Sequence, residues 1–231
     1  MCIENKDPIE GLMEDSFAEC LLNDDLVIDL KNWDGHDEQI KQIFTTYKEK
    51  VNPLISVYNA LENSFPIGVI NELRDVFSHL TLSLQVTDTA EVDRHLDKAH
   101  RHLKRAVVDA FKYASMAYSK VYDDFKDAYK YVDLGYVDNG TLLPKLTKLN
   151  TEAEKLMHEA KMVESGVHDD DKMYAAYEKA FNCYATLYNS IINSLEATEA
   201  IKLKTIEDEE ARKKEHRPDS GSLLSLRGSR C

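Results

Sequence analysis

Apolar residues recur at every third or fourth position along most of this chain, which is the spacing of an α-helix that buries one face. From about Asp37 the pattern predicts a helix whose apolar stripe reaches Leu61 and whose axis kinks at Pro53. A second helix is predicted from about Pro66 to Gln85. Its inward positions are predicted to be Ile70, Leu73, Val76, Phe77, Leu80 and Leu84.

A third helix is predicted to begin after Asp88, because this residue suits an N-cap and Glu91 stands three positions later. Neither Gly nor Pro follows until Gly135, so the helix can run for about forty residues, or roughly 60 Å. Only a short turn joins it to the second helix, so the two are expected to form an antiparallel hairpin. Its later part has the four-and-three spacing of a coiled coil, at Val107, Phe111, Ala114, Tyr118, Val121, Phe125 and Ala128.

Two further predicted helices repeat this seam. Asp138-Asn139-Gly140 predicts the turn before the fourth helix, and Ser165-Gly166 predicts its end. The fifth helix follows Asp169-Asp170-Asp171, a run of acidic residues that suits the positive end of a helix dipole. The seam positions are Leu142, Leu146, Leu149, Ala153, Leu156, Ala160 and Val163, then Tyr174, Tyr177, Phe181, Tyr184, Tyr188, Ile191 and Leu195. We interpret the aromatic seam as core packing rather than a ligand-stacking surface.

Together these patterns predict an all-α fold, an elongated up-and-down helical bundle with long antiparallel coiled-coil-like helices. The predicted parts are an N-terminal accessory arm at 1–35, a helical bundle at 36–212 and a flexible tail at 213–231, of native or vector origin. Within the bundle, a hairpin at about 67–115 leads into a long-helix extension at about 107–206.

Charge and composition narrow the classes of function. The net charge is -13, so a phosphate-rich partner meets overall repulsion unless basic residues gather locally. No stretch approaches the roughly 18 apolar residues of a transmembrane helix, and the cysteines are scattered without CxxC spacing. We therefore expect a cytoplasmic protein that does not enter membranes. The sequence also lacks the phosphate-loop, dinucleotide-binding and serine-hydrolase motifs.

The candidate chemistry lies on the predicted hairpin. On the second helix, Asp75 and His79 are four residues apart and share a face, so the carboxylate can orient the imidazole, and Arg74 lies beside them. The third helix carries a polar stripe at steps of three and four, formed by His95, Lys98, His102, Arg105 and Asp109. A hairpin would bring part of this stripe close to His79.

These residues carry a family resemblance. The spacing Arg74-x4-His79, with polar Asp75 directly after the arginine, resembles the RX4-6H motif of the HEPN superfamily of helical-bundle proteins. Arg94 and His100 form a second match to this spacing. The segment ELRDVFSHL followed by LDKAHRHLKRAVVDAF is similar to the paired helices of small bacterial HEPN-like domains, whose A-x-x-HL-x-RA-x-x-DA pattern is matched by His102, Arg105 and Asp109. The similarity covers about residues 67–115.

The resemblance implies a component of bacterial or phage conflict systems, such as antiviral defence or toxin-antitoxin pairs, that binds RNA or cleaves it without a metal or cofactor. Catalytic residues would be Arg74, Asp75 and His79, with His79 as general acid or base on the 2′-hydroxyl and Arg74 stabilising phosphorane charge. The third-helix stripe would bind RNA or line a dimer cleft. Two such sites are expected to face each other in a homodimer.

A second interpretation treats the chain as a non-catalytic interaction module. The hairpin would then form a homodimer face, and the long acidic helices would hold a protein partner. The heptad seams and the negative charge favour this interpretation, as does the position of the motif on the second helix rather than on a late one. A zinc site at His95, His100 and His102 is conceivable, because histidines seven apart and mixed His/Asp faces can bind zinc, but no HExxH motif or paired cysteines support it, so no metal is predicted.

Overall fold

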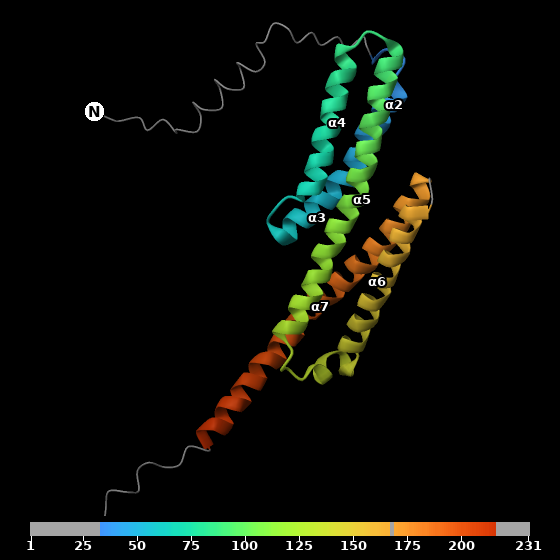
Figure 1. Ribbon diagram of the computed structural model, residues 1–231. Helices are drawn as coiled ribbons and strands as arrows, with labels where there is room; N and C mark the ends of the chain where they lie inside the picture. The colour runs from blue at the N-terminus through green and yellow to red at the C-terminus, as the bar shows by residue number, and fades with distance from the viewer. Residues whose placement is uncertain (1–32, 167–168, 216–231) are drawn as a thin grey trace, which may run out of the picture. The chain divides into compact units, whose positions relative to one another are not determined.

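The computed structural model describes residues 33–166 and 169–215, and this part of the chain is all α-helical (Figure 1). The predicted fold class is confirmed, because long helices pack antiparallel and the described residues include no strand. The chain divides between Ala110 and Phe111 into two compact units, called unit 1 and unit 2 below. Most of the predicted N-terminal arm and C-terminal tail lies outside the described residues.

Unit 1 is a small helical bundle. Its elements are α2 (Asp37–Thr46), a π-helical turn (Tyr47–Val51), α3 (Asn52–Glu62), α4 (Ile67–Gln85) and the first part of α5 (Thr89–Ala128). Apolar side chains from all of these elements form its core, including Ile43, Val51, Leu54, Val69, Leu73, Val92, Leu96 and Leu103. The antiparallel hairpin of α4 and α5 is the part that positions the candidate site (Figure 1).

One prediction about α4 is wrong. Ile70 and Phe77 were expected to face inward, but their side chains are 40% and 55% exposed. The buried stripe consists of Val69, Leu73, Val76, Leu80 and Ser83. Neighbouring residues on a helix point about 100° apart, so α4 carries two apolar stripes, and the pattern alone does not tell which one meets the core.

The ends of the unit 1 helices follow from local chemistry. Asp88 is the predicted N-cap of α5, since its Oδ1 accepts a hydrogen bond of 3.1 Å from the backbone N–H of Ala90. At Pro53 a kink was expected, and the structure has the π-helical turn, which ends directly before Asn52 and Pro53. Pro53 has no backbone N–H to give to an α-helical bond, so the wider turn lies where the α-helical hydrogen-bond ladder is weakest.

Unit 2 contains the second part of α5, a 3-10 segment (Leu134–Gly140), α6 (Leu142–Gly166) and α7 (Asp170–Glu215). The predicted turn at residues 138–140 is confirmed by positive φ angles of 49°, 54° and 80°. Asp169 caps α7 by accepting a 3.1 Å hydrogen bond from the N–H of Lys172. The core contains the predicted seam residues Phe125, Leu142, Leu146, Ala153, Tyr184 and Ile191. Tyr122, Tyr129 and Leu187 are also buried there although they were not predicted, whereas the predicted seam residue Ala128 is exposed. The aromatic seam therefore packs as a core, as predicted.

None of the helices in residues 33–166 and 169–215 is long and apolar enough to span a membrane. The exposed surface of these helices carries most of their charged residues.

Candidate functional site

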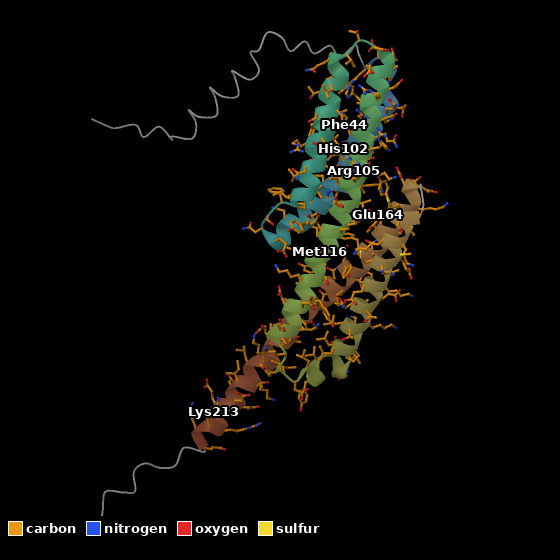
Figure 2. The ribbon with its side chains drawn as sticks, viewed as in Figure 1. Phe44, His102, Arg105, Met116, Glu164 and Lys213 are labelled. Carbon is orange, nitrogen blue, oxygen red and sulfur yellow. The ribbon has the colours of Figure 1, made fainter. Side chains whose placement is uncertain are left out.

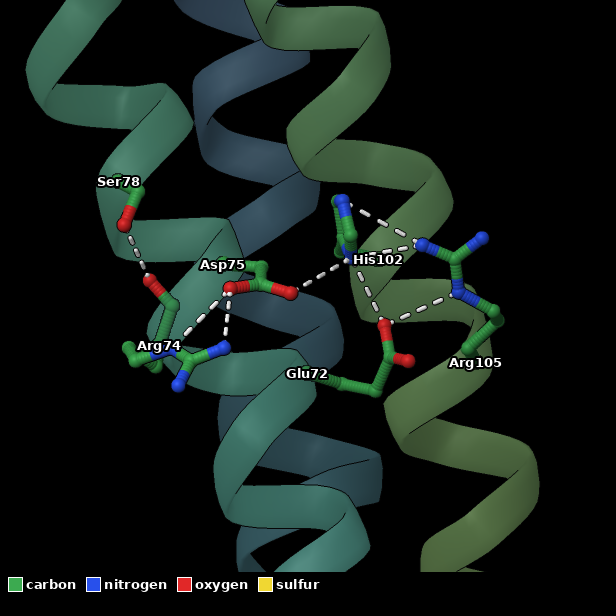
Figure 3. Close-up of polar contacts among 6 residues, drawn as sticks. All are labelled: Glu72, Arg74, Asp75, Ser78, His102 and Arg105. Atoms are coloured by element: carbon green, nitrogen blue, oxygen red, sulfur yellow. Dashed lines mark hydrogen bonds and ion pairs between the residues drawn. The ribbon is translucent and has the colours of Figure 1, made fainter.

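Glu72 on α4 joins two basic residues of α5 (Figure 3). Its Oε2 accepts hydrogen bonds from Arg105 Nε at 3.0 Å and from His102 Nδ1 at 2.8 Å. The antiparallel arrangement of α4 and α5 brings these side chains together, although they lie about thirty positions apart in sequence. His102 and Arg105 are also three apart on one helix (Figure 2), so both can reach the same carboxylate.

The carboxylate determines which nitrogen of His102 carries a proton. Arg105 Nη2 lies 2.6 Å from His102 Nδ1 and 3.3 Å from Nε2. Both Arg105 Nη2 and a protonated Nδ1 are donors, so they do not hydrogen-bond to each other, whereas Glu72 accepts from each. The consistent arrangement has Nδ1–H donating to Glu72. Nε2 then remains an acceptor, either for Arg105 or for a proton from a ligand.

A second pair of histidines lies beside this group. His79 Nδ1 is 3.2 Å from His95 Nδ1, and the ring centroid of His79 lies 5.4 Å from the centroids of both His95 and His102. Burial lowers the pKa of His79, and the nearby His102, His95 and Lys98 lower it further. Burial likewise lowers the pKa of His95, followed by Arg94 and Lys98. Both imidazoles are therefore neutral at pH 7, and one donates to the other.

Arg74 and Asp75 form a separate ion pair. Asp75 Oδ1 accepts from Arg74 Nε at 3.1 Å and from Nη2 at 3.0 Å, and this hydrogen bonding lowers the pKa of Asp75 (Figure 3). The other oxygen, Oδ2, lies 3.7 Å from His102 Nδ1. In the described residues, the hydrogen-bond partner of His79 is His95 rather than Asp75, which was expected to orient it.

A cavity of about 330 Å³ opens between α4 and α5, and every side chain that lines it is basic. The lining residues are His79, Lys98, Arg101, His102 and Arg105. In the part of the chain that the structure describes, neither Lys98 nor Arg101 forms an ion pair, whereas Arg105 shares Glu72 with His102. Two positive charges therefore remain without a carboxylate in this cavity, called the basic cavity below.

A larger cavity of about 840 Å³ runs along another face of α4. It is mainly apolar and is called the α4 groove below. Its lining residues are Ile70, Leu73, Arg74, Phe77, Ser78, Thr81, Leu82 and Gln85. The groove was not predicted, because Ile70 and Phe77 had been placed in the core.

The structure thus brings together only some of the residues expected at the site. His79, Lys98, His102 and Arg105 line the basic cavity, and His95 lies buried behind His79. Arg74 lines the α4 groove instead, and Asp109 lies one turn beyond Arg105 and lines neither cavity. Arg101 was missed by the sequence reasoning, although its spacing from Lys98 and Arg105, three and four residues, places it on the same face of the helix.

No protein-family model, curated protein or solved structure matches this chain. Within residues 33–166 and 169–215, no group of three or more His, Cys, Asp or Glu side chains is placed to hold a metal ion. The HEPN-like resemblance of residues 67–115 remains an expectation.

Proposed function

We propose that unit 1 binds RNA by its phosphate backbone in the basic cavity. The observation that carries this proposal is the cavity lining, which is entirely basic and includes two cations, Lys98 and Arg101, without ion-pair partners among the described residues. A phosphodiester would supply the missing negative charge and accept charge-assisted hydrogen bonds from both side chains. Because the chain carries a net charge of -13, binding elsewhere on it is disfavoured, and the contact stays local.

The same cavity has groups suited to metal-independent RNA cleavage. Neutral His79, whose pKa is held low by burial, would act as a general base on the 2′-hydroxyl. His102, whose Nδ1–H donates to Glu72, would need a second proton on Nε2, which it would give to the leaving 5′-oxygen while His79 keeps the proton taken from the 2′-hydroxyl. Lys98 and Arg101 would stabilise the charge that develops on the phosphorane, a role that the family resemblance gives to Arg74. The chain would then act as a HEPN-like ribonuclease of a conflict system.

The proposal is tested by measuring binding of a labelled single-stranded RNA by fluorescence anisotropy, in EDTA and at several salt concentrations. Lys98→Gln combined with Arg101→Gln should weaken binding about tenfold and lower the salt slope by about two. The matched control, Lys41→Gln with Lys155→Gln, removes the same charge from exposed lysines outside the cavity. Equal affinity of the cavity variant and the control would contradict the proposal.

Cleavage is tested separately from binding. His79→Ala should retain RNA affinity within about threefold but lose cleavage, because a general base typically contributes 10²–10⁴-fold in rate. RNA integrity is followed by gel electrophoresis with EDTA present. If the wild-type chain binds RNA but does not cleave it, the proposal of ribonuclease activity is wrong and RNA binding alone stands.

A second candidate function, a homodimeric interaction module, is favoured by the exposed α4 groove. Ile70, Phe77 and Leu82 are all at least 40% exposed and lie together in this groove, and contiguous exposed apolar side chains are typical of an interaction surface. The lining positions are symmetric about Phe77 and Ser78, so an antiparallel pair of α4 helices places Leu73 of one copy opposite Leu82 of the other. Sedimentation of the wild type beside Phe77→Glu tests this, since a dimer through the groove should dissociate in the variant.

A further inference from the structure

Among the residues that the structure describes, the basic cavity has a surplus of two positive charges. Lys98, Arg101 and Arg105 contribute three permanent cations to its lining. The carboxylate of Glu72 offsets one of them, because its Oε2 accepts a 3.0 Å hydrogen bond from Arg105 Nε (Figure 3). Lys98 and Arg101 have no such carboxylate in residues 33–166 and 169–215, so their two charges remain for a ligand.

Neither the nearby Asp75 nor the histidines change this surplus at pH 7. Asp75 Oδ2 lies 3.7 Å from His102 Nδ1, but the charge of Asp75 is offset by Arg74, whose Nη2 is 3.0 Å from its Oδ1. Burial holds the pKa of His79 below its usual value, so this imidazole is neutral. The cavity is therefore matched by a ligand that carries about two negative charges.

The phosphate groups of RNA differ in charge according to their position in the strand. A phosphodiester within the strand carries a single negative charge. A terminal phosphate is a phosphomonoester, which carries a charge of about -1.5 to -2 at pH 7 and has three acceptor oxygens. The three cations of the cavity only donate hydrogen bonds, so they suit a ligand whose oxygens only accept. A terminal phosphate therefore matches the cavity better than a phosphodiester does.

We propose that the RNA group which the basic cavity binds most tightly is a terminal phosphate, and that Lys98 and Arg101 distinguish it from a phosphate within the strand. This inference rests on the proposed function, since it names the part of RNA that the same cavity binds. The planar guanidinium of Arg101 can donate to two phosphate oxygens at once, and the ammonium of Lys98 supplies the second charge. Contacts to phosphate carry no direct sequence information, so the terminal base is not selected.

The size of the cavity and the charge of the chain both favour the end of a strand. A volume of about 330 Å³ is close to the lower limit of ligand sites, which span roughly 300–1,000 Å³. A phosphate within a strand brings a neighbouring phosphate on each side, whereas a terminal phosphate brings only one. Because the chain has a net charge of -13, neighbours that extend beyond the cavity are repelled. The terminal phosphate meets less of this repulsion.

His102 adds a contact that a phosphomonoester can use and a phosphodiester cannot. Its Nδ1–H donates to Glu72 Oε2 at 2.8 Å, so its Nε2 remains an acceptor. A phosphomonoester whose second proton is still bound can donate this proton to Nε2, since its second pKa is about 6. A phosphodiester has no proton to donate near neutral pH. The cavity thus has a partner for each protonation state of a terminal phosphate.

The preference is measured on the full chain by fluorescence anisotropy, with single-stranded RNA whose 2′-hydroxyls are methylated so that it is not cleaved. One set of strands ends in a 5′-hydroxyl, a 5′-phosphate or a 5′-methyl phosphate, and a second set has the same three groups at the 3′ end. The methyl phosphate keeps the phosphate but carries one charge fewer. At one of the two ends, the phosphate should bind about tenfold more tightly than the hydroxyl, and methylation should remove most of this gain.

Two results of this measurement would overturn the inference. One is equal affinity for the phosphate and hydroxyl ends in both sets of strands. The other is a methyl phosphate that binds as tightly as the phosphate at the preferred end, since the second charge would then contribute nothing. A preference at either end supports the inference and identifies the terminus that the cavity binds.

The two distinguishing residues are tested by the ratio of affinities for the phosphate and hydroxyl ends. Arg101→Gln removes one surplus charge and should reduce this ratio from about tenfold to about threefold or less. The matched control, Lys41→Gln, removes an exposed charge from α2 of the same unit and should keep the ratio. The ratio compares two ligands on one variant, so a partial loss of folded protein does not change it. An unchanged ratio in both Arg101→Gln and Lys98→Gln would overturn the assignment.

Mononucleotides separate this inference from the proposed function. Adenosine 5′-monophosphate and 3′-monophosphate are titrated into the full chain by calorimetry, with adenosine as the control. Binding of a monophosphate that Lys98→Gln with Arg101→Gln abolishes, in a chain that binds no RNA strand, would support the inference and overturn the proposed function. RNA binding without an end preference would overturn the inference alone. Absence of binding by every strand and nucleotide would overturn both.

Discussion

The basic cavity of unit 1 and the carboxylates Glu164 and Glu199 of unit 2 differ in how completely their charges are paired. In unit 2, Glu164 accepts hydrogen bonds from Tyr177 and from Lys112, the latter at 3.1 Å, and the ammonium of Lys112 also lies 5.6 Å from the Tyr177 ring centroid. Glu199 has a similar set, a hydrogen bond from Tyr129 and an ion pair with Lys202 at 3.5 Å. In unit 1, Lys98 and Arg101 have no such carboxylate among the described residues.

This difference separates polar groups that stabilise a fold from those available to a ligand. Burial alone raises the pKa of Glu164, but the hydrogen bonds from Tyr177 and Lys112 outweigh it and hold the pKa below its usual value. The paired charge of unit 2 is thus stabilised within the chain. Lys98 and Arg101 of the basic cavity have no such carboxylate among the described residues, so they remain available to an anionic ligand.

The largest change in stability is expected when a paired carboxylate is removed from unit 2. Glu164→Ala should lower the free energy of unfolding by about 2 kcal/mol, because it leaves the Tyr177 hydroxyl and the Lys112 ammonium without their shared acceptor. Urea denaturation followed by circular dichroism measures the loss. Glu159→Ala, which removes only an exposed pair with Lys155, is the control and should cost less than about 0.5 kcal/mol.

Acid should destabilise unit 1 through its neutral histidines. The pKa values of His79 and His95 are lowered on folding, so below about pH 6.5 the unfolded chain binds more protons than the folded chain. The stabilisation from these two neutral histidines is therefore fully present above this pH. It is lost as the pH falls towards their pKa values in the folded chain. The slope is at most about 1.4 kcal/mol per pH unit for each histidine. His79→Gln with His95→Gln should flatten the profile of unfolding free energy between pH 6.5 and pH 5, and an unchanged slope would refute this origin.

Glu72→Gln should move stability and affinity in opposite directions. It weakens the acceptor shared by His102 and Arg105, which should cost about 1 kcal/mol of unfolding free energy. It also removes the carboxylate that balances Arg105, so RNA affinity should rise about threefold. Urea denaturation measures the expected fall in unfolding free energy, and fluorescence anisotropy on the same preparation measures the expected rise in RNA affinity. A fall in affinity would mean that Glu72 positions the cations more than it neutralises them.

Alkaline pH should lower the stability of unit 2 through Tyr129. Burial, aided by the hydrogen bond to Glu199, raises the pKa of Tyr129 to about 12. The unfolded tyrosine ionises near pH 10, so the stability from this group is present below that pH and is lost as the pH rises towards 12. Difference spectra at 295 nm should show Tyr129 ionising at a lower pH in Glu199→Ala than in the wild type, while burial still keeps its pKa raised in the variant.

The smallest effect is expected at Arg74. Its side chain is 69% exposed, pairs with Asp75 and lines the α4 groove rather than the basic cavity. Arg74→Ala should therefore leave RNA affinity within about twofold of wild type, since an exposed pair contributes little. Arg101→Ala is the comparison from within the cavity and should weaken binding about threefold or more. If Arg74→Ala weakened RNA binding more than Arg101→Ala, Arg74 would be the residue that contacts the phosphate, as the family resemblance implies.

Sequence periodicity located the helices well, but it could not orient α4. The ends of α4 and the Asp88 cap follow from local chemistry, whereas the choice between the Val69–Val76 face and the Ile70–Phe77 face depends on how α4 packs against the rest of unit 1. The same one-residue ambiguity affects the site. Arg74 and Asp75 are neighbours in sequence, but only Asp75 reaches His102 while Arg74 turns to the groove.

The convergence of His79 with His102 could be anticipated, because an antiparallel hairpin with a short turn fixes which residues face each other. The role of Glu72 could not be anticipated from the sequence, because one carboxylate among many on a charged helix has no distinguishing spacing. Pairing partners across helices depend on rotamers and on the exact helix contact, which a one-dimensional pattern does not contain.

The π-helical turn at residues 47–51 has a consequence for how this chain tolerates insertions and deletions. A π-turn accommodates one residue more than an α-helical turn of the same length, so it marks a place where one residue can be gained or lost without rotating the helix on either side. Deleting one residue there should convert the turn to regular α-helix and keep the faces of both α2 and α3 directed to the core. The same deletion within α4 would turn its later residues by about 100° and separate His79 from His95.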